Sequence, residues 1–162
     1  MTRKQQRIYR KAYSLLEHHT PLRADCGALC GRACCRGDDE TGMLLFPGET
    51  TPFRVIKKNG RRLAVCGGQC RRFDRPLGCR LFPFVPLPGP DGRIAAVLDS
   101  RGRGCCPLVA HAGKAAFSRR FLHRAKRVGV LLCRDEDCRA FLEEIRREME
   151  DLDALRARFS SE

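Results

Sequence analysis

Eight of the eleven cysteines in this 162-residue chain follow a spacing that could serve metal binding, disulfide formation or redox chemistry. They are Cys26, Cys30, Cys34 and Cys35 in a first block, Cys66, Cys70 and Cys79 in a second, and finally Cys106. Thiolates are soft ligands that select zinc, copper(I) or the iron of iron–sulfur clusters, whereas hard cations prefer oxygen. Glycines adjoin several of these thiols, and glycine lets a backbone wrap closely around an ion. The pattern therefore predicts a metal centre.

The gaps between the cysteines exclude the commonest metal motifs. No pair has the two-residue gap of zinc ribbons or thioredoxin-type redox sites, and neither ferredoxin spacing is present. A three-residue gap places two thiols one helical turn apart, so both can face one ion. Eight thiols suffice for two four-thiolate sites or for one polynuclear cluster. The adjacent Cys34 and Cys35 are expected to point apart and to serve different ions.

The remainder of the chain favours a reducing compartment. No apolar segment typical of a secretory signal precedes His18, and no stretch approaches the ~18 consecutive apolar residues of a membrane span. Cytoplasmic proteins keep their thiols reduced, which favours metal binding over a disulfide framework. We therefore expect a cytoplasmic protein with no membrane contact.

The chain carries a large excess of positive charge. It holds 32 Lys and Arg against 19 Asp and Glu, a formal net charge of +13. Such a field favours a nucleic acid or an acidic partner, although no recognised nucleic-acid motif accompanies it and a basic surface that serves solubility is the alternative. The sequence offers one candidate strip for such a partner, made of Arg119, Arg120, Arg124, Lys126 and Arg127.

Strand signals lie in the middle of the chain. Residues 53–57 and 61–65 alternate as strands, and Asn59-Gly60 between them predicts a hairpin because both residues tolerate a positive φ. The second of these strands runs directly into Cys66. A further strand is expected over residues 93–98, after a turn rich in glycine and proline.

Helix signals lie towards the two ends. Apolar residues at helical spacing predict an amphipathic helix over Ile8 to Glu17. A second helix is expected from Pro107 to Val128, before Gly129, because proline suits a first helical turn and glycine often follows a helix. A third helix is expected from about Asp135, whose charge suits a helix N-terminus.

Three segments resemble the YkgJ-like cysteine-cluster family, which is described as a zinc- or iron-chelating domain. They are the Cys34-Cys35 pair that closes the first block, the segment Leu45 to Glu49, and the segment Arg75 to Phe84 with its Arg-Pro-x-x-Cys-Arg-x-aromatic-Pro pattern. The resemblance covers roughly residues 20–110. The family usually opens with gaps of two residues where this chain has three, so the pairing of thiols with ions stays open.

The resemblance implies a set of metal ligands, which are Cys26, Cys30, Cys34, Cys35, Cys66, Cys70, Cys79 and Cys106. Cys106 is preferred to Cys105 because the last cysteine of the family tends to precede proline, and Cys105 is a possible substitute. Cys133 and Cys138 fall outside the match. Cys138 lies on the apolar face of the last predicted helix, where core packing is expected.

Other polar residues near the motif have two interpretations each. Arg75 and Arg80 could donate N–H groups to thiolates, which would tune the metal, or form ordinary surface ion pairs with Glu49 or Asp74. Glu49 itself is interpreted as a solvated turn residue, with a role at a helix start or behind the metal ligands as the alternative. Of the four histidines, His111 is the best candidate for a nitrogen ligand.

These features together predict an α+β fold, a small, irregular, cysteine-rich metal-binding domain with a short β-hairpin and flanking N- and C-terminal helices. The expected single domain covers 1–162, with a metal-binding core over 20–110, an N-terminal helix in 1–19 and C-terminal helices in 107–162. The expected function is binding of zinc or of an iron–sulfur cluster. The alternatives are an iron–sulfur-dependent protein-modifying enzyme resembling flagellin lysine methylases, and a basic adaptor for nucleic acid or an acidic partner with structural zinc.

Overall fold

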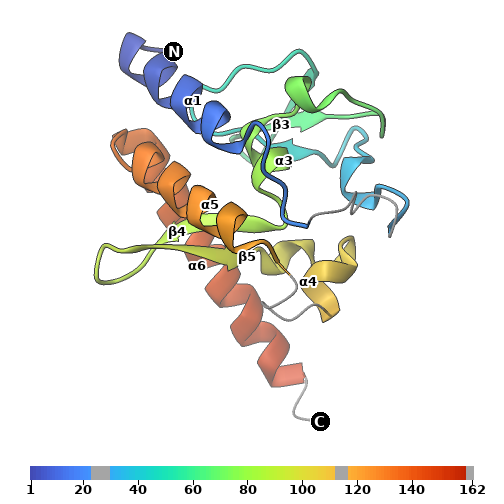
Figure 1. The fold of residues 1–162 in the computed structure, drawn as a ribbon. Helices are drawn as coiled ribbons and strands as arrows, with labels where there is room; N and C mark the ends of the chain where they lie inside the picture. Colours follow the sequence, from blue (N-terminus) through green and yellow to red (C-terminus); the bar gives the residue numbers. More distant parts are fainter. Residues whose placement is uncertain (23–29, 112–116, 160–162) are drawn as a thin grey trace.

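A computed structural model describes residues 1–22, 30–111 and 117–159, and it has the predicted α+β architecture (Figure 1). Its helices are α1 (Arg3–Leu16), α3 (Leu77–Leu81), α4 (Pro107–His111), α5 (Arg119–Leu132) and α6 (Glu136–Phe159). Its strands are β1 (Met43–Leu44), β2 (Arg54–Lys58), β3 (Arg61–Val65), β4 (Phe84–Pro88) and β5 (Ile94–Leu98). Among the described residues, no helix is both long and apolar enough to cross a bilayer.

The first helix is longer at its N-terminal end than its apolar pattern predicts. Thr2 and Gln5 form a capping box, in which each side chain accepts a hydrogen bond from the backbone N–H of the other. This pair satisfies two N–H groups that a helix start leaves unpartnered, so the helix begins at Arg3 rather than near Ile8. The predicted apolar face is confirmed, since Ile8, Ala12 and Leu16 are buried.

The predicted hairpin is confirmed. Strands β2 and β3 pair antiparallel with Lys58 opposite Arg61, and Asn59 and Gly60 both have positive φ in the two-residue turn. The short strand β1 adds to the other edge of β3. Because β3 ends at Val65, the sheet fixes the position of the Cys66 backbone.

The predicted strand over residues 93–98 is also confirmed, but its partner was not expected. Strand β5 pairs with β4, which contains Pro86 and Pro88 and is buried along most of its length. Proline is found at sheet edges, and β4 tolerates two because this sheet has only two strands. Helices α5 and α6 both pack against β4 (Figure 1).

The single helix expected over Pro107 to Val128 is wrong. The chain instead forms α4, which ends at His111, and a separate α5, which starts after Ser118. The Ser118 hydroxyl accepts a hydrogen bond from the Phe121 N–H and so caps the new helix. Helix α5 then continues through Gly129 to Leu132, so this glycine does not end the helix.

Gly129 has a packing role. A Cβ added at this position would lie 2.5 Å from Ile94 Cγ2 and 2.7 Å from Pro86 Cβ, much closer than carbon atoms approach one another. The missing side chain therefore lets α5 lie directly on the β4–β5 sheet.

Replacing Gly129 with alanine is expected to lower the free energy of unfolding by about 1–3 kcal/mol, the usual cost of overpacking a core. The intrinsic helix preference for alanine, about 1 kcal/mol, offsets only part of this cost. Urea unfolding followed by far-UV circular dichroism measures the change. Val130→Ala is the matched control, because the adjacent side chain is 47% exposed. A Gly129→Ala protein at least as stable as the wild type would contradict this packing role.

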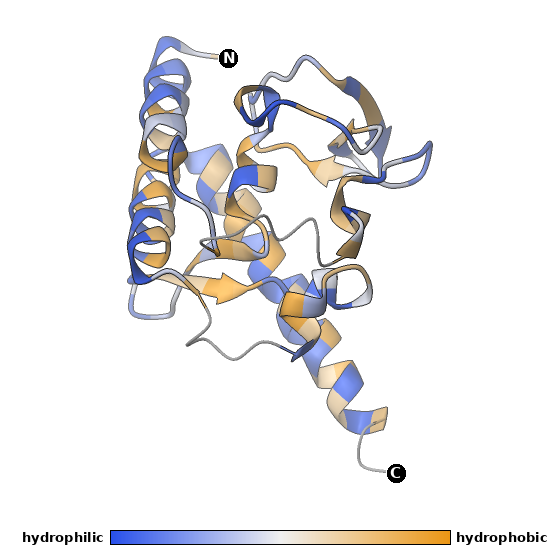
Figure 2. Cartoon of the chain, turned by 45° about the vertical axis from the view of Figure 1, so that its right-hand side comes forward, coloured by the Kyte–Doolittle hydropathy of each residue, from blue (hydrophilic) through white to orange (hydrophobic). Residues whose placement is uncertain are grey.

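The hydrophobic core lies between α1, the β4–β5 sheet, α5 and α6, and Leu77 and Leu81 of α3 also belong to it. Figure 2 shows hydrophobic and hydrophilic residues alternating along these helices, as expected for helices with one buried side. Helix α6 starts where predicted, with the Asp135 side chain accepting a hydrogen bond from the Cys138 N–H. Cys138 belongs to this core and is fully buried, as its helical position predicts. The described thiols of the predicted metal site lie outside the core.

Candidate metal centre

A small cavity of about 130 Å³ brings together thiols from three separate segments of the chain. The cysteines that line it are Cys34, Cys35, Cys66, Cys70 and Cys79. The first two lie on the 3₁₀ turn η1 (Ala33–Cys35), the next two follow β3, and the last lies within α3. Five predicted ligands that span 46 positions of sequence thus face one space, as a thiolate metal site requires.

Cys34 and Cys35 do not point apart as their adjacency predicted. Their Sγ atoms are only 4.0 Å apart. Successive side chains point about 180° apart in a strand but only about 120° apart in a 3₁₀ helix. The two cysteines lie in such a helix, which Arg32 precedes with a φ of 59°. Thiolates bound to one tetrahedral zinc at about 2.3 Å lie about 3.8 Å from one another. The pair therefore has nearly the separation of two ligands on one ion.

Backbone contacts hold the first cysteine block against the second. The Gly37 N–H donates to the Cys66 carbonyl at 3.0 Å, and Arg36 forms an isolated bridge with Gly67. A Cβ on Gly37 would lie 2.9 Å from the Thr41 carbonyl oxygen and 3.2 Å from the Cys66 nitrogen. Glycine at this position thus permits the close approach of the two blocks.

The Glu49 carboxylate holds the helix that carries Cys79. One of its oxygens accepts from the Leu77 N–H at 2.7 Å and from the Tyr13 hydroxyl, and the other accepts from the Phe46 N–H at 3.0 Å. Burial raises the pKa of Glu49 and these three hydrogen bonds lower it. The interpretation of Glu49 as a solvated turn residue is wrong, since the residue is 1% exposed. This buried side chain therefore joins the Leu45-to-Glu49 segment to the Arg75-to-Phe84 segment.

The two arginines of the Arg75-to-Phe84 segment have different roles. Burial lowers the pKa of Arg75, but a hydrogen bond to Cys70 and the charges of nearby thiols outweigh burial and raise it. Arg75 therefore lies against the thiols, and its Nε is buried with no partner among the described residues. Arg80 instead donates to the Phe73 and Arg75 carbonyl groups and stacks on Tyr13. Asp74 pairs with Arg71, and Glu49 accepts from Tyr13, Phe46 and Leu77. Among the described contacts, neither arginine forms the alternative ion pair with Glu49 or Asp74.

The environment of the cavity disfavours thiolates when no cation is present. Burial raises the pKa of Cys79, and the neighbouring Cys35, Cys70 and Cys66 raise it further. Burial also raises the pKa of Cys66, against a hydrogen bond from the Gly68 N–H that lowers it. Clustered thiolates repel one another, so a bound cation is the natural counter-charge for this set.

A second group of thiols lies at the turn between η3 (Ser100–Gly104) and α4. Burial raises the pKa of Cys105, and Cys106, Cys30 and Asp99 raise it further, so these groups lie close together. Cys106 is 7% exposed, whereas Cys105 is exposed. Cys105 also lines a groove of about 590 Å³ that Cys34 shares, which places Cys34 between the two groups. The predicted ligand Cys26 lies outside the described residues.

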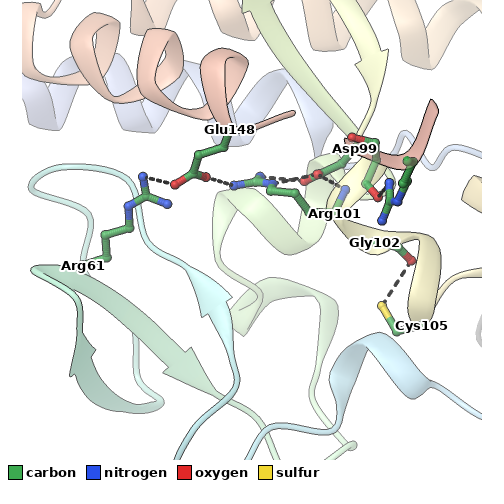
Figure 3. A network of polar contacts seen from close by, with 8 residues as sticks. Arg61, Asp99, Arg101, Gly102, Cys105 and Glu148 are labelled. Atoms are coloured by element: carbon green, nitrogen blue, oxygen red, sulfur yellow. Dashed lines mark hydrogen bonds and ion pairs between the residues drawn. The ribbon is translucent and has the colours of Figure 1, made fainter. Parts of the chain in front are cut away.

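A chain of ion pairs connects these two regions (Figure 3). Arg61 of β3 pairs with Glu148 of α6, Glu148 pairs with Arg101 at 3.3 Å, and Arg101 pairs with Asp99 at 2.7 Å. The Cys105 thiol lies next to this chain and donates to the Gly102 carbonyl at 3.5 Å. The long helix α6 thus ties the hairpin that precedes Cys66 to the turn that carries Cys105.

The assignment of this site rests on its own residues. Comparisons with models of known protein families, with curated proteins and with solved structures give no match. Within residues 1–22, 30–111 and 117–159, no three Cys, His, Asp or Glu side chains are placed to hold an ion as they stand. His111 is exposed at the end of α4. The thiols, their spacing and their surroundings therefore carry the functional argument.

Proposed function

We propose that this protein binds zinc or an iron–sulfur cluster through two neighbouring groups of thiolates. The first group is Cys34, Cys35, Cys66, Cys70 and Cys79, of which Cys34 also borders the second group. The second is Cys30 and Cys106, with Cys26 from the same block and Cys105 as the possible substitute for Cys106. The observation that carries the proposal is the shared cavity, because thiols from three segments gather there outside the hydrophobic core.

The surroundings of the cavity support thiolates as metal ligands. Arg75 supplies an N–H donor and positive charge beside the thiols, as residues behind metal ligands commonly do. The resemblance of the Arg75-to-Phe84 segment to the YkgJ-like family agrees with this cofactor class. A closed four-thiolate zinc site would be structural, because a catalytic zinc keeps an open coordination position.

One observation favours an enzyme as a second candidate function. The groove that contains Cys34 and Cys105 opens beside the thiol cavity and is lined by charged side chains of both signs. A substrate bound there would lie next to the metal centre. An iron–sulfur-dependent modifying enzyme, as the resemblance to flagellin lysine methylases implies, would need such a groove.

Metal analysis of protein purified without oxygen tests the proposal. We expect a fixed metal content, with either about two zinc ions per chain, the number that eight thiolates can bind, or iron together with acid-labile sulfide. A colourless zinc protein supports a structural centre, whereas broad visible absorbance that oxygen bleaches supports the enzyme. Protein that contains no metal, with the five thiols of the cavity titrating freely in the folded state, would overturn the proposal.

A further inference from the structure

Helices α1 and α5 form a strongly basic surface on the side of the core away from α6. They lie side by side in Figure 1 and make one of the most extensive contacts between elements. Neither helix contains an acidic residue. Their ten cations are Arg3, Lys4, Arg7, Arg10 and Lys11 on α1, and Arg119, Arg120, Arg124, Lys126 and Arg127 on α5. Helix α6, in contrast, carries eight acidic residues against five basic ones.

A groove between these two helices concentrates the charge. It has a volume of about 620 Å³, and its cations are Arg10, Lys11, Arg127 and Arg134. No acidic residue lines it among those that the structure describes. All four cations are exposed, and none pairs with another described residue. Some exposed arginines elsewhere do have a carboxylate or carbonyl partner, as Arg54, Arg93 and Arg139 do. The groove is thus a site of uncompensated positive charge.

The positive surface continues towards the C-terminal end of α1. Burial lowers the pKa of His19, and the charges of Arg124, His18, Arg120 and Arg72 lower it further. The end of α1 therefore lies close to the first turns of α5, where Arg119 and Arg120 are exposed and Arg124 is half-buried. Cations thus follow the whole length of the helix pair.

We propose that the α1–α5 groove binds the phosphate backbone of a nucleic-acid duplex. Closely spaced, unpaired Lys and Arg side chains neutralise successive phosphates and release their counterions. The aromatic residues of the two helices, Tyr9, Tyr13 and Phe121, are buried or half-buried. They cannot stack on unpaired bases, so a paired backbone fits the surface better than a single strand.

The same surface does not fit a membrane. An interfacial helix inserts large apolar side chains below the lipid headgroups. Most apolar residues of α1 and α5 face the core. Of the three that line the groove among the described residues, Leu15 and Leu131 are half-buried and only Val130 is exposed. Recognition of the groove therefore rests on charge, and it is independent of the metal centre.

Binding of a fluorescein-labelled 20-base-pair duplex, followed by anisotropy over a range of salt concentrations, tests this inference. Four phosphate contacts predict a slope of log affinity against log salt of about −3.6, which is a loss of about 150-fold between 50 and 200 mM salt. The variant R10A/K11A/R127A/R134A is expected to lose at least tenfold in affinity at 50 mM salt and most of the slope. The matched control K57A/R93A/R147A/R158A removes the same charge from exposed positions outside the groove. It should keep most of the affinity and most of the salt dependence.

Far-UV circular dichroism establishes that both variants fold, and the pair R10E/R127E provides a second test that should abolish binding. Equal losses in the groove variant and the control would overturn the inference, because the net charge alone would then explain binding. Tighter binding to anionic lipid vesicles or to poly-glutamate than to the duplex would also overturn it, as would the absence of any binding at 50 mM salt.

Discussion

Replacing Cys79 with serine is expected to release the metal of the first site and to unfold the cysteine-rich part of the chain, while the helical core stays folded. A serine hydroxyl is a much weaker ligand for soft metals than a thiolate. Metal binding contributes directly to folding wherever few apolar contacts hold the ligands in place. The thiols of the cavity lie outside the core, whereas α1, α5 and α6 have apolar contacts of their own. The effect should therefore be large but local.

Two measurements separate these effects. Elemental analysis should show the loss of about half of the bound zinc, or of the whole cluster if the centre is polynuclear. Hydrogen exchange should increase around η1 and β3, while the amides of α5 and α6 keep their protection. Cys133→Ser is the control, because Cys133 follows α5 and lies outside both thiol groups. Full metal content in Cys79→Ser would remove this residue from the ligand set.

Changing Glu49 to glutamine is expected to lower the free energy of unfolding by about 1–3 kcal/mol, the cost of leaving a buried hydrogen-bonding group unsatisfied. The carboxylate accepts from three donors, the N–H groups of Phe46 and Leu77 and the hydroxyl of Tyr13. Burial raises the pKa of Tyr13, so its hydroxyl keeps the proton that it donates. Glutamine has a single acceptor oxygen, and its NH₂ group would face one of these donors. The start of α3 would lose its anchor, and the position of Cys79 would change with it.

Urea unfolding and metal competition with a chelator measure the two consequences. The control is Glu40→Gln, the same change at an exposed carboxylate that pairs with Lys58, where a change of less than about 0.5 kcal/mol is expected. We expect Glu49→Gln to lose metal to the chelator at lower concentrations than the control does. Equal stability and equal metal retention in both variants would show that the buried carboxylate is not what positions α3.

Local patterns in the sequence were sufficient for several elements. Asn59-Gly60 predicted the hairpin because a type I′ turn depends on two adjacent residues. The apolar stripe that contains Cys138 predicted α6 and the burial of that thiol, because helix periodicity is itself local. The break between α4 and α5 was missed, since the cap at Ser118 is a weak signal within a helix-forming stretch.

The sequence by itself determined which residue types are present for chemistry, namely clustered soft ligands and an excess of positive charge. The tertiary structure decided how they are grouped. It brought five thiols around one cavity, buried Glu49 behind α3, and set α1 against α5 so that their cations line one groove. It also gave Gly129 its role, because only packing against β4 and β5 makes a missing side chain necessary. Each of these features depends on contacts between segments far apart in the chain, which local spacing does not specify.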